Sequence, residues 1–150
     1  MVEEKYMKEA VKEAKKAFAA GEVPIGAVLV CGDKIIARGY NKKETSKKAT
    51  AHAEIIAVEK ACKKKGDWRL NDCTLYVTAE PCLMCCGAIL QARIGRLVFG
   101  ISNDKFGCVE SIDRVLENAK HNHHIKIEKG LCAGEAASLL QQFFQKNRVK

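Results

Sequence analysis

The spacing of apolar residues predicts a chain that begins with one helix and a β-hairpin. From Glu3 to Ala20, apolar residues recur every three or four positions, which is typical of an amphipathic helix. Two β-rich runs, 27–31 and 34–40, follow it and are separated by a Gly-Asp turn, which predicts a hairpin. The next segment, 41–50, contains four lysines and no apolar anchor, so it favours a solvated loop.

Strands and helices then alternate toward the C-terminus. The same rules predict strands over 73–78, 97–100 and 125–128, and helices over 52–65, 82–93, 112–118 and 133–148. Strands that are separated by helices tend to pair in parallel, with helices on both faces of the sheet. The predicted fold is therefore α/β, with three α/β/α layers around one mixed, mainly parallel sheet of five strands. Its binding crevice is expected at the carboxyl ends of the parallel strands.

Composition narrows the class of protein. The 150 residues suit a single domain over 1–150. No apolar run approaches the ~20 residues of a membrane span, and the charged N-terminus lacks the features of a secretory signal, so we expect a cytoplasmic protein without membrane contact. With 26 Lys and Arg against 18 Asp and Glu, the net charge of +8 favours a nucleic-acid partner, although basic surfaces also serve solubility alone.

The eight cysteines are expected to be metal ligands or buried thiols, because disulfides are rare in a reducing compartment. Two of them, Cys82 and Cys85, lie three positions apart at the start of a predicted helix, so both can face one ion. The remaining six lie mostly in apolar segments and are expected to pack as small hydrophobic side chains: Cys31, Cys62, Cys73, Cys86, Cys108 and Cys132.

His52 begins another predicted helix and is a third candidate ligand for the ion that Cys82 and Cys85 can face. A helix N-terminus lowers the pKa of a nearby thiol and so favours the thiolate that zinc binds. Three protein ligands leave one tetrahedral corner for water, which is typical of a catalytic zinc ion. Glu54, two residues after His52, is suited to move protons at that corner.

The order His-x-Glu and then Pro-Cys-x-x-Cys is the signature of zinc-dependent nucleobase deaminases. Around this signature the sequence resembles the bacterial tRNA adenosine deaminases, which belong to the cytidine and deoxycytidylate deaminase superfamily, along nearly its whole length. The segments that carry the resemblance are Glu22–Val28, Gly39–Asn41, Thr50–Ile55, Leu75–Cys85 and Arg93–Gly100.

The resemblance implies a cytidine deaminase-like fold and hydrolytic conversion of the wobble adenosine of a tRNA to inosine, with release of ammonia. It implies one zinc ion per subunit, held by His52, Cys82 and Cys85, and proton transfer by Glu54. It also implies the tRNA anticodon stem-loop as partner and a homodimer. For the substrate, it implies contacts from Asn41 to the base or sugar, from the Ala53 backbone N–H to the attacking oxygen, and from Pro24 and Ile25 to the flipped nucleotide. Asn41 is alternatively a simple turn residue.

One loop departs from the pattern of the relatives. Where they often carry an acidic residue that is expected to contact the RNA backbone, this chain has Asn103. Either Asp104 takes over that contact or Asn103 donates a hydrogen bond in its place, and Lys105 follows as a further candidate contact. The departure bears on how the flanking nucleotide is held and how strictly ribose is required.

The C-terminal part offers weaker signals. The histidines at 121, 123 and 124 suggest a second metal site, but a surface turn is favoured, with RNA contact as the alternative. Phe143 and Phe144 are expected in the core, with base contact as the alternative for both, and the basic residues of the last helix are expected to contact phosphates.

Four other interpretations stay open from the sequence alone. The same metal chemistry serves guanine, cytosine or free-nucleoside deaminases, although these need no basic surface. A zinc-stabilised RNA-binding module without turnover has no use for Glu54. A redox pair or a closed structural zinc site would involve Cys82 and Cys85 differently, the latter with Cys73 or Cys86 as a fourth ligand.

Overall fold

The computed structural model describes residues 3–148. In chain order its elements are α1 (Glu4–Ala19), β1 (Gly26–Cys31), β2 (Lys34–Tyr40), α2 (Lys43–Ser46), α3 (Ala53–Lys65), β3 (Cys73–Ala79), α4 (Leu83–Gln91), β4 (Arg96–Ile101), the 3-10 helix η1 (Val115–Glu117), β5 (Lys126–Lys129) and α5 (Ala133–Arg148). Apart from α2 and η1, each element begins and ends within two residues of its predicted bounds.

The helix predicted over 112–118 is wrong, because only the single 3-10 turn η1 forms there. Ile112 is 58% exposed, whereas Leu116 is buried. The apolar residues of the segment therefore do not share one buried stripe that would stabilise a longer helix. The predicted loop over 41–50 also contains one helical turn, α2.

The five strands form one mixed sheet in the order β2-β1-β3-β4-β5. Strand β1 pairs antiparallel with both β2 and β3, while β3 with β4 and β4 with β5 pair in parallel. The four strands β2 to β5 thus run in one direction and β1 alone opposes them. The prediction of a mainly parallel sheet is confirmed in the sense that most strands run in one direction. Half of the neighbouring pairs are nevertheless antiparallel, because β1 lies between β2 and β3.

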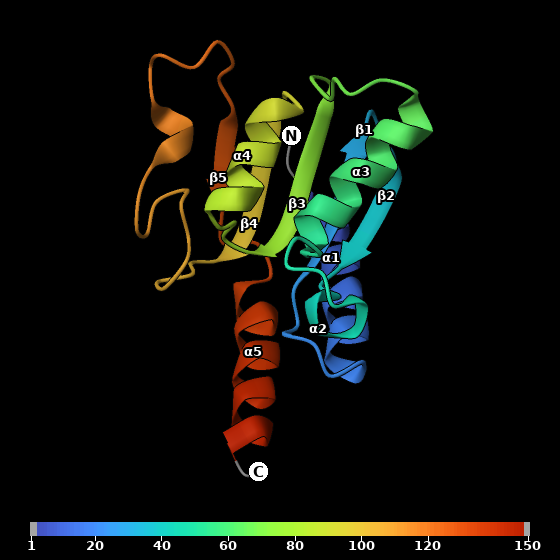
Figure 1. The fold of residues 1–150 in the computed structure, drawn as a ribbon, viewed down its shortest axis with the longest axis vertical. Helices are drawn as coiled ribbons and strands as arrows, with labels where there is room; N and C mark the ends of the chain where they lie inside the picture. Colours follow the sequence, from blue (N-terminus) through green and yellow to red (C-terminus); the bar gives the residue numbers. More distant parts are fainter. Residues whose placement is uncertain (1–2, 149–150) are drawn as a thin grey trace.

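Helices cover both faces of the sheet, which confirms the three layers (Figure 1). Helices α1 and α5 pack on one face, and α3 and α4 pack on the other. Alternate strand residues divide between the two sides, as the two-residue period of a strand requires. Val28 and Tyr76 join the core under α1, whereas Leu29 and Leu75 join the core under α3 and α4.

A close contact between α3 and β2 fixes where α3 begins. A Cβ atom on Gly39 would lie 2.5 Å from the carbonyl oxygen of Ala53, so only glycine permits this approach. The contact holds the first turn of α3, and with it His52, against the end of β2.

Two of the six cysteines that were expected to be reduced are joined, so that expectation is wrong for them. A disulfide links Cys31 to Cys73. The two residues lie directly opposite each other where β1 pairs with β3, with Cα atoms 4.3 Å apart. Their separation of 42 residues in the chain hides this proximity from the sequence. Cys62, Cys86, Cys108 and Cys132 are free thiols.

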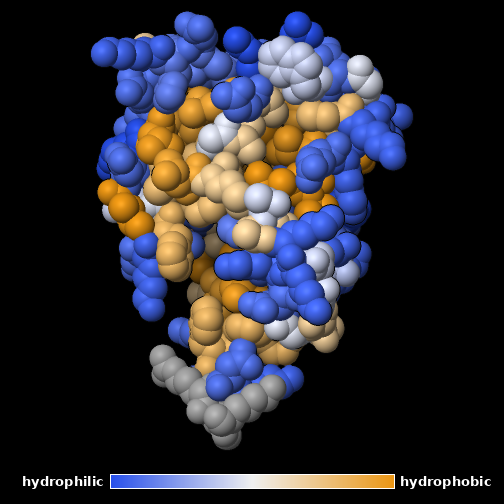
Figure 2. Space-filling view, in the orientation of Figure 1, coloured by the Kyte–Doolittle hydropathy of each residue, from blue (hydrophilic) through white to orange (hydrophobic). Residues whose placement is uncertain are grey.

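The face that carries α3 and α4 has an apolar centre, and hydrophilic side chains gather over α2 (Figure 2). Within residues 3–148, no helix combines the length and the apolar character that a membrane crossing needs.

Candidate active site

The N-termini of α3 and α4 converge beside the carboxyl end of β3. His52 is the N-cap residue of α3, and Cys82 is the N-cap residue of α4, three residues after β3 ends. Cys85 follows one turn into α4, on the face that Cys82 shares. The structure therefore places the three candidate metal ligands at the carboxyl ends of the parallel strands, where the binding site was expected.

The three side chains converge at distances that suit one metal ion. Nδ1 of His52 lies 3.6 Å from Sγ of Cys82 and 3.5 Å from Sγ of Cys85. Ligands at bond lengths of about 2.1 to 2.3 Å around a tetrahedral ion lie roughly 3.6 Å from one another. The donor set of one imidazole and two sulfurs fits such an ion without any rearrangement of the backbone.

Within the described residues 3–148, the cluster contains three potential ligands and not four. Both candidates for a fourth ligand point elsewhere. Cys73 is bonded to Cys31, and the thiol of Cys86 lies 3.7 Å from the carbonyl oxygen of Pro81. The arrangement is therefore the three-ligand one, which leaves a corner of the tetrahedron open.

The pKa values of the three side chains in the cluster are shifted by their contacts with one another and by burial. The hydrogen bond from Cys85, together with His52, lowers the pKa of Cys82 to about 4. The same partner, Cys82, and burial raise the pKa of Cys85. The hydrogen bond with Cys82 also raises the pKa of His52. One sulfur is therefore a thiolate at neutral pH, and a metal that binds both sulfurs has to displace the proton of Cys85.

Glu54 lies in the first turn of α3 and is 5% exposed. Burial raises its pKa to about 7, and the contacts with its own backbone N–H, with His52 and with Cys85 oppose burial only in part. A carboxyl group with this pKa can take up and release a proton near neutral pH. It is therefore placed, two residues from His52, to act as acid and base next to the cluster.

The segment that follows β2 is held by a buried carboxylate to which the sequence interpretation gave no role. Glu22 is 1% exposed and accepts hydrogen bonds from the backbone N–H groups of Glu44 at 3.0 Å and Thr45 at 2.6 Å. These contacts fix the turn α2. Asn41 lies beside it and is also buried.

The side chain of Asn41 is engaged with the backbone at both ends. Its Nδ2 donates to the carbonyl oxygen of Val23 at 3.2 Å, and its Oδ1 accepts from the N–H of Lys43 at 3.1 Å. These two hydrogen bonds are those of a turn residue, which is the role that the sequence left open for Asn41. Its contact with a substrate stays a prediction.

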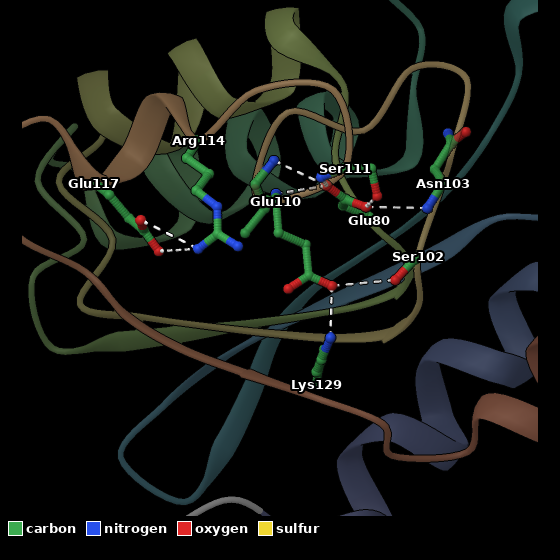
Figure 3. A network of polar contacts seen from close by, with 9 residues as sticks. Glu80, Ser102, Asn103, Glu110, Ser111, Arg114, Glu117 and Lys129 are labelled. Carbon is green, nitrogen blue, oxygen red and sulfur yellow. Dashed lines mark hydrogen bonds and ion pairs between the residues drawn. The ribbon is translucent and has the colours of Figure 1, made fainter.

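The loop 102–111 is organised by Glu80, as Figure 3 shows. Glu80 is 2% exposed and accepts from the backbone N–H groups of Asn103, Val109, Glu110 and Ser111 and from the hydroxyl of Ser111. Burial alone would raise the pKa of Glu80, but these hydrogen bonds outweigh it, so its pKa lies below the usual range. The sequence did contain a signal for this residue, a charge between the apolar run of β3 and Pro81.

The other predicted contact residues lie in different surroundings. Pro24 and Ala53 are buried, and Ile25 packs at the edge of the core under α3. The N–H of Ala53 belongs to the first turn of α3 and so has no partner within that helix. Asp104 and Lys105 are exposed in the loop 102–111.

Phe144 lies on α5 and is 48% exposed, so the core position that was expected for it is wrong. Phe143 is half-buried against Phe18 of α1, with ring centroids 6.3 Å apart. Helix α5 reaches past the edge of the sheet (Figure 1).

The histidines near 121 form a turn rather than a metal site. Nε2 of His121 lies 2.7 Å from the carbonyl oxygen of Val115, and Nε2 of His123 lies 2.6 Å from that of Ile94. Within residues 3–148, none of these histidines belongs to a group of three side chains that could hold a metal ion. These contacts support the surface turn that the sequence favoured.

Comparisons with known proteins agree with this geometry. The sequence model of the MafB19-like deaminase family matches residues 1–148. The tRNA-specific adenosine deaminase of Bacillus subtilis (strain 168) is 47% identical over 148 residues, which cover 99% of this chain and 92% of that protein.

Solved structures show the same fold. One from work on A-to-I editing by tRNA:A34 deaminases at the wobble position of transfer RNA has a TM-score of 0.88 and 42% identity, covering 92% of this chain and all of that one. The guanine deaminase of Nitrosomonas europaea has a TM-score of 0.78 and 25% identity, covering 95% of this chain and 84% of that one. The chain therefore belongs to the MafB19-like deaminase family and, within it, to the tRNA-specific adenosine deaminases.

Proposed function

We propose that this protein hydrolyses the 6-amino group of the wobble adenosine in a tRNA anticodon, giving inosine and ammonia. The observation that carries the proposal is the convergence of His52, Cys82 and Cys85 with Glu54 beside them. The sequence identity with tRNA-specific adenosine deaminases over nearly the whole chain supports the choice of substrate.

We further propose that the metal is zinc, held by His52, Cys82 and Cys85. One imidazole and two thiolates are the donor set that zinc shares with few other biological cations. When bound, zinc supplies Lewis-acid activation of the attacking water. The N-termini of α3 and α4 both point their unpaired N–H groups at this place and stabilise negative charge there.

Glu54 is the proposed proton carrier. Its carboxylate accepts one proton from the attacking water and delivers it to a nitrogen of the adenine ring. It then accepts the second proton from the new hydroxyl group and delivers it to the departing amino group, which leaves as ammonia. The pKa of about 7 that burial gives Glu54 allows both protonation states at neutral pH. The Ala53 N–H, which has no partner within α3, is proposed to orient the attacking oxygen.

The substrate is proposed to be RNA and not a free base. The chain carries a net charge of +8, and lysines lie on α2 and on the loop 102–111. Such side chains neutralise phosphates and position an RNA strand. By the same resemblance we expect a homodimer in the cytoplasm and retain Asn41, Pro24 and Ile25 as contacts to the flipped nucleotide.

The test uses an anticodon stem-loop with adenosine at the first anticodon position. The zinc-loaded protein should release ammonia from this RNA and should spare a matched stem-loop in which the adenosine stands one position downstream. Free adenosine, guanine and cytosine serve as parallel substrates, because a guanine deaminase shares the fold. Turnover of the free compounds alone would overturn the assignment to RNA.

A further inference from the structure

The loop 102–111 is tied to the start of α4 at three points. The backbone of Gly107 forms a bridge with that of Cys82, and the N–H of Cys108 donates to the carbonyl oxygen of Pro81 at 2.9 Å. The third tie is the side chain of Glu80, which lies beneath the loop (Figure 3). The loop therefore reaches a metal-ligand residue directly, and Glu80 sits between the two.

The five donors divide unevenly between the two oxygens of Glu80. Oε2 accepts the N–H groups of Val109 at 3.0 Å, Glu110 at 2.8 Å and Ser111 at 3.0 Å. Oε1 accepts the N–H of Asn103 at 3.0 Å and the hydroxyl of Ser111. The Asn103 end of the loop is thus held by Oε1 alone, whereas the Val109–Ser111 end is held by Oε2 and, through the Ser111 hydroxyl, also by Oε1.

The space around the carboxylate is filled by the loop itself. A Cβ atom on Gly107 would collide with the carboxylate of Glu80 and would lie 2.6 Å from the carbonyl oxygen of Asn103. Four backbone N–H groups and a hydroxyl point at Glu80, so only a group with acceptors at both oxygens satisfies them. The loop and the carboxylate therefore fit each other in shape and in polarity.

We propose that Glu80 is a positioning residue for the RNA substrate, because its buried carboxylate fixes the Asn103 end of the loop 102–111 relative to Cys82. This inference rests on the proposed function. Asn103, Asp104 and Lys105 stand at that end, so their place relative to the reacting base follows from the hydrogen bond between Asn103 N–H and Glu80. Glu80 itself touches neither the substrate nor the metal.

The substitution Glu80→Gln separates the two ends of the loop. Glutamine keeps one acceptor oxygen, which satisfies most donors at the Oε2 position, and its amide NH₂ then faces the N–H of Asn103. Two donors that face each other lose their hydrogen bond, whereas the hydroxyl of Ser111 can turn and accept. The substitution therefore releases the Asn103 end and keeps the Val109–Ser111 end.

Glu110→Gln is the matched control, since it removes a carboxylate from the same loop. The side chain of Glu110 points the other way, to Ser102 and Lys129 on the outside of the loop (Figure 3). Ser111→Ala is a milder second variant in case Glu80→Gln does not fold, because it removes one donor and keeps the carboxylate.

The experiment combines two measurements on the zinc-loaded proteins. In the first, amide exchange read by nuclear magnetic resonance should be about tenfold faster at Asn103 in Glu80→Gln than in the parent, and unchanged in Glu110→Gln. In the second, Glu80→Gln should raise KM for the anticodon stem-loop about tenfold while kcat stays within about twofold. Ser111→Ala removes one of the two donors that hold Oε1 and so loosens the carboxylate beside Asn103; it should raise KM and speed amide exchange at Asn103, each by about twofold to threefold.

An unchanged KM with a lower kcat would reduce Glu80 to a residue that only stabilises the fold, and the proposal would be wrong. Unchanged exchange at Asn103 would overturn it as well. If the parent protein does not act on the stem-loop, the proposed function fails, but the exchange at Asn103 still decides whether Glu80 holds the loop. If Glu80→Gln does not fold, the same two measurements on Ser111→Ala decide it.

Discussion

Glu54 and Glu80 are both buried glutamates near the candidate metal ligands, and their surroundings shift their pKa values in opposite directions. Their exposed fractions are nearly equal, 5% for Glu54 and 2% for Glu80. Glu80 accepts four backbone N–H groups and a hydroxyl, and its pKa lies below the usual range. Burial dominates at Glu54 instead and raises its pKa to about 7.

The difference teaches that burial alone does not decide the charge of a carboxyl group. The number of donors aimed at the oxygens decides it, because each donor stabilises the ionised form. A fully satisfied carboxylate stays ionised and organises a loop. A carboxyl group that is left short of donors exchanges its proton near neutral pH, which is the property that an acid and base in a catalytic site needs.

The largest expected effect comes from removing the ion beside Glu54. Cys85→Ala deletes one of three ligands, so the variant should lose its bound zinc and all measurable turnover. Metal analysis of the purified protein measures the loss. Cys86→Ala is the matched control, because Cys86 is the next residue and its thiol points to Pro81, so this variant should keep one zinc per chain. A Cys85→Ala protein that retains stoichiometric zinc would contradict the ligand set.

The next effect is on stability in the metal-free protein. The pKa of Glu54 is higher in the folded chain than the ordinary 4.5. Its contribution to the free energy of unfolding is therefore fully present below pH 4.5 and is lost as the pH rises through about 7. Relative to Glu54→Gln, the parent should therefore lose on the order of 3 kcal/mol of unfolding free energy between pH 4 and pH 9. Urea unfolding at both pH values measures this difference.

For Glu80, the same experiment should show the opposite dependence of stability on pH, so the two glutamates can be compared directly. Its pKa is lowered on folding, so its contribution is present above the ordinary pKa and disappears as pH falls through the lowered one. The parent should therefore lose its advantage over Glu80→Gln on acidification. Equal pH dependence in both comparisons would remove the distinction between the two glutamates.

The smallest expected effect concerns the loop that Glu80 holds. Asn103→Asp restores the acidic residue that relatives often carry, and its carboxylate accepts a stronger hydrogen bond from a ribose hydroxyl than an amide oxygen does. The ratio of kcat/KM for the RNA stem-loop over a matched DNA stem-loop should rise by about threefold. An unchanged ratio would show that Asn103 does not sense the sugar.

The fold and the group of candidate metal ligands could be predicted from the sequence wherever local patterns carry the information. His52 and Cys82 stand at helix starts that apolar spacing and neighbouring strands define, so their convergence could be predicted from the order of elements. The position of β1 between β2 and β3, and hence the contact of Cys31 with Cys73, depends on pairing across distant segments. No local pattern encodes it.

The roles of Glu22 and Glu80 could not be predicted for a related reason. A glutamate in an apolar stretch signals that something compensates its charge, but backbone N–H groups in a distant loop leave no mark in the sequence. The same holds for the segment 112–118, where helical spacing was present but the core offered a place to Leu116 and none to Ile112.

The most direct test of the account is the deamination rate of zinc-loaded Glu54→Gln on the anticodon stem-loop, measured together with zinc content and RNA affinity. Glutamine occupies the same volume but carries no exchangeable acid proton at neutral pH. The account predicts one zinc per chain, RNA affinity within about twofold of the parent, and a rate lower by about 10² to 10⁴. A variant that deaminates at the parent rate would contradict the role of Glu54 as proton carrier.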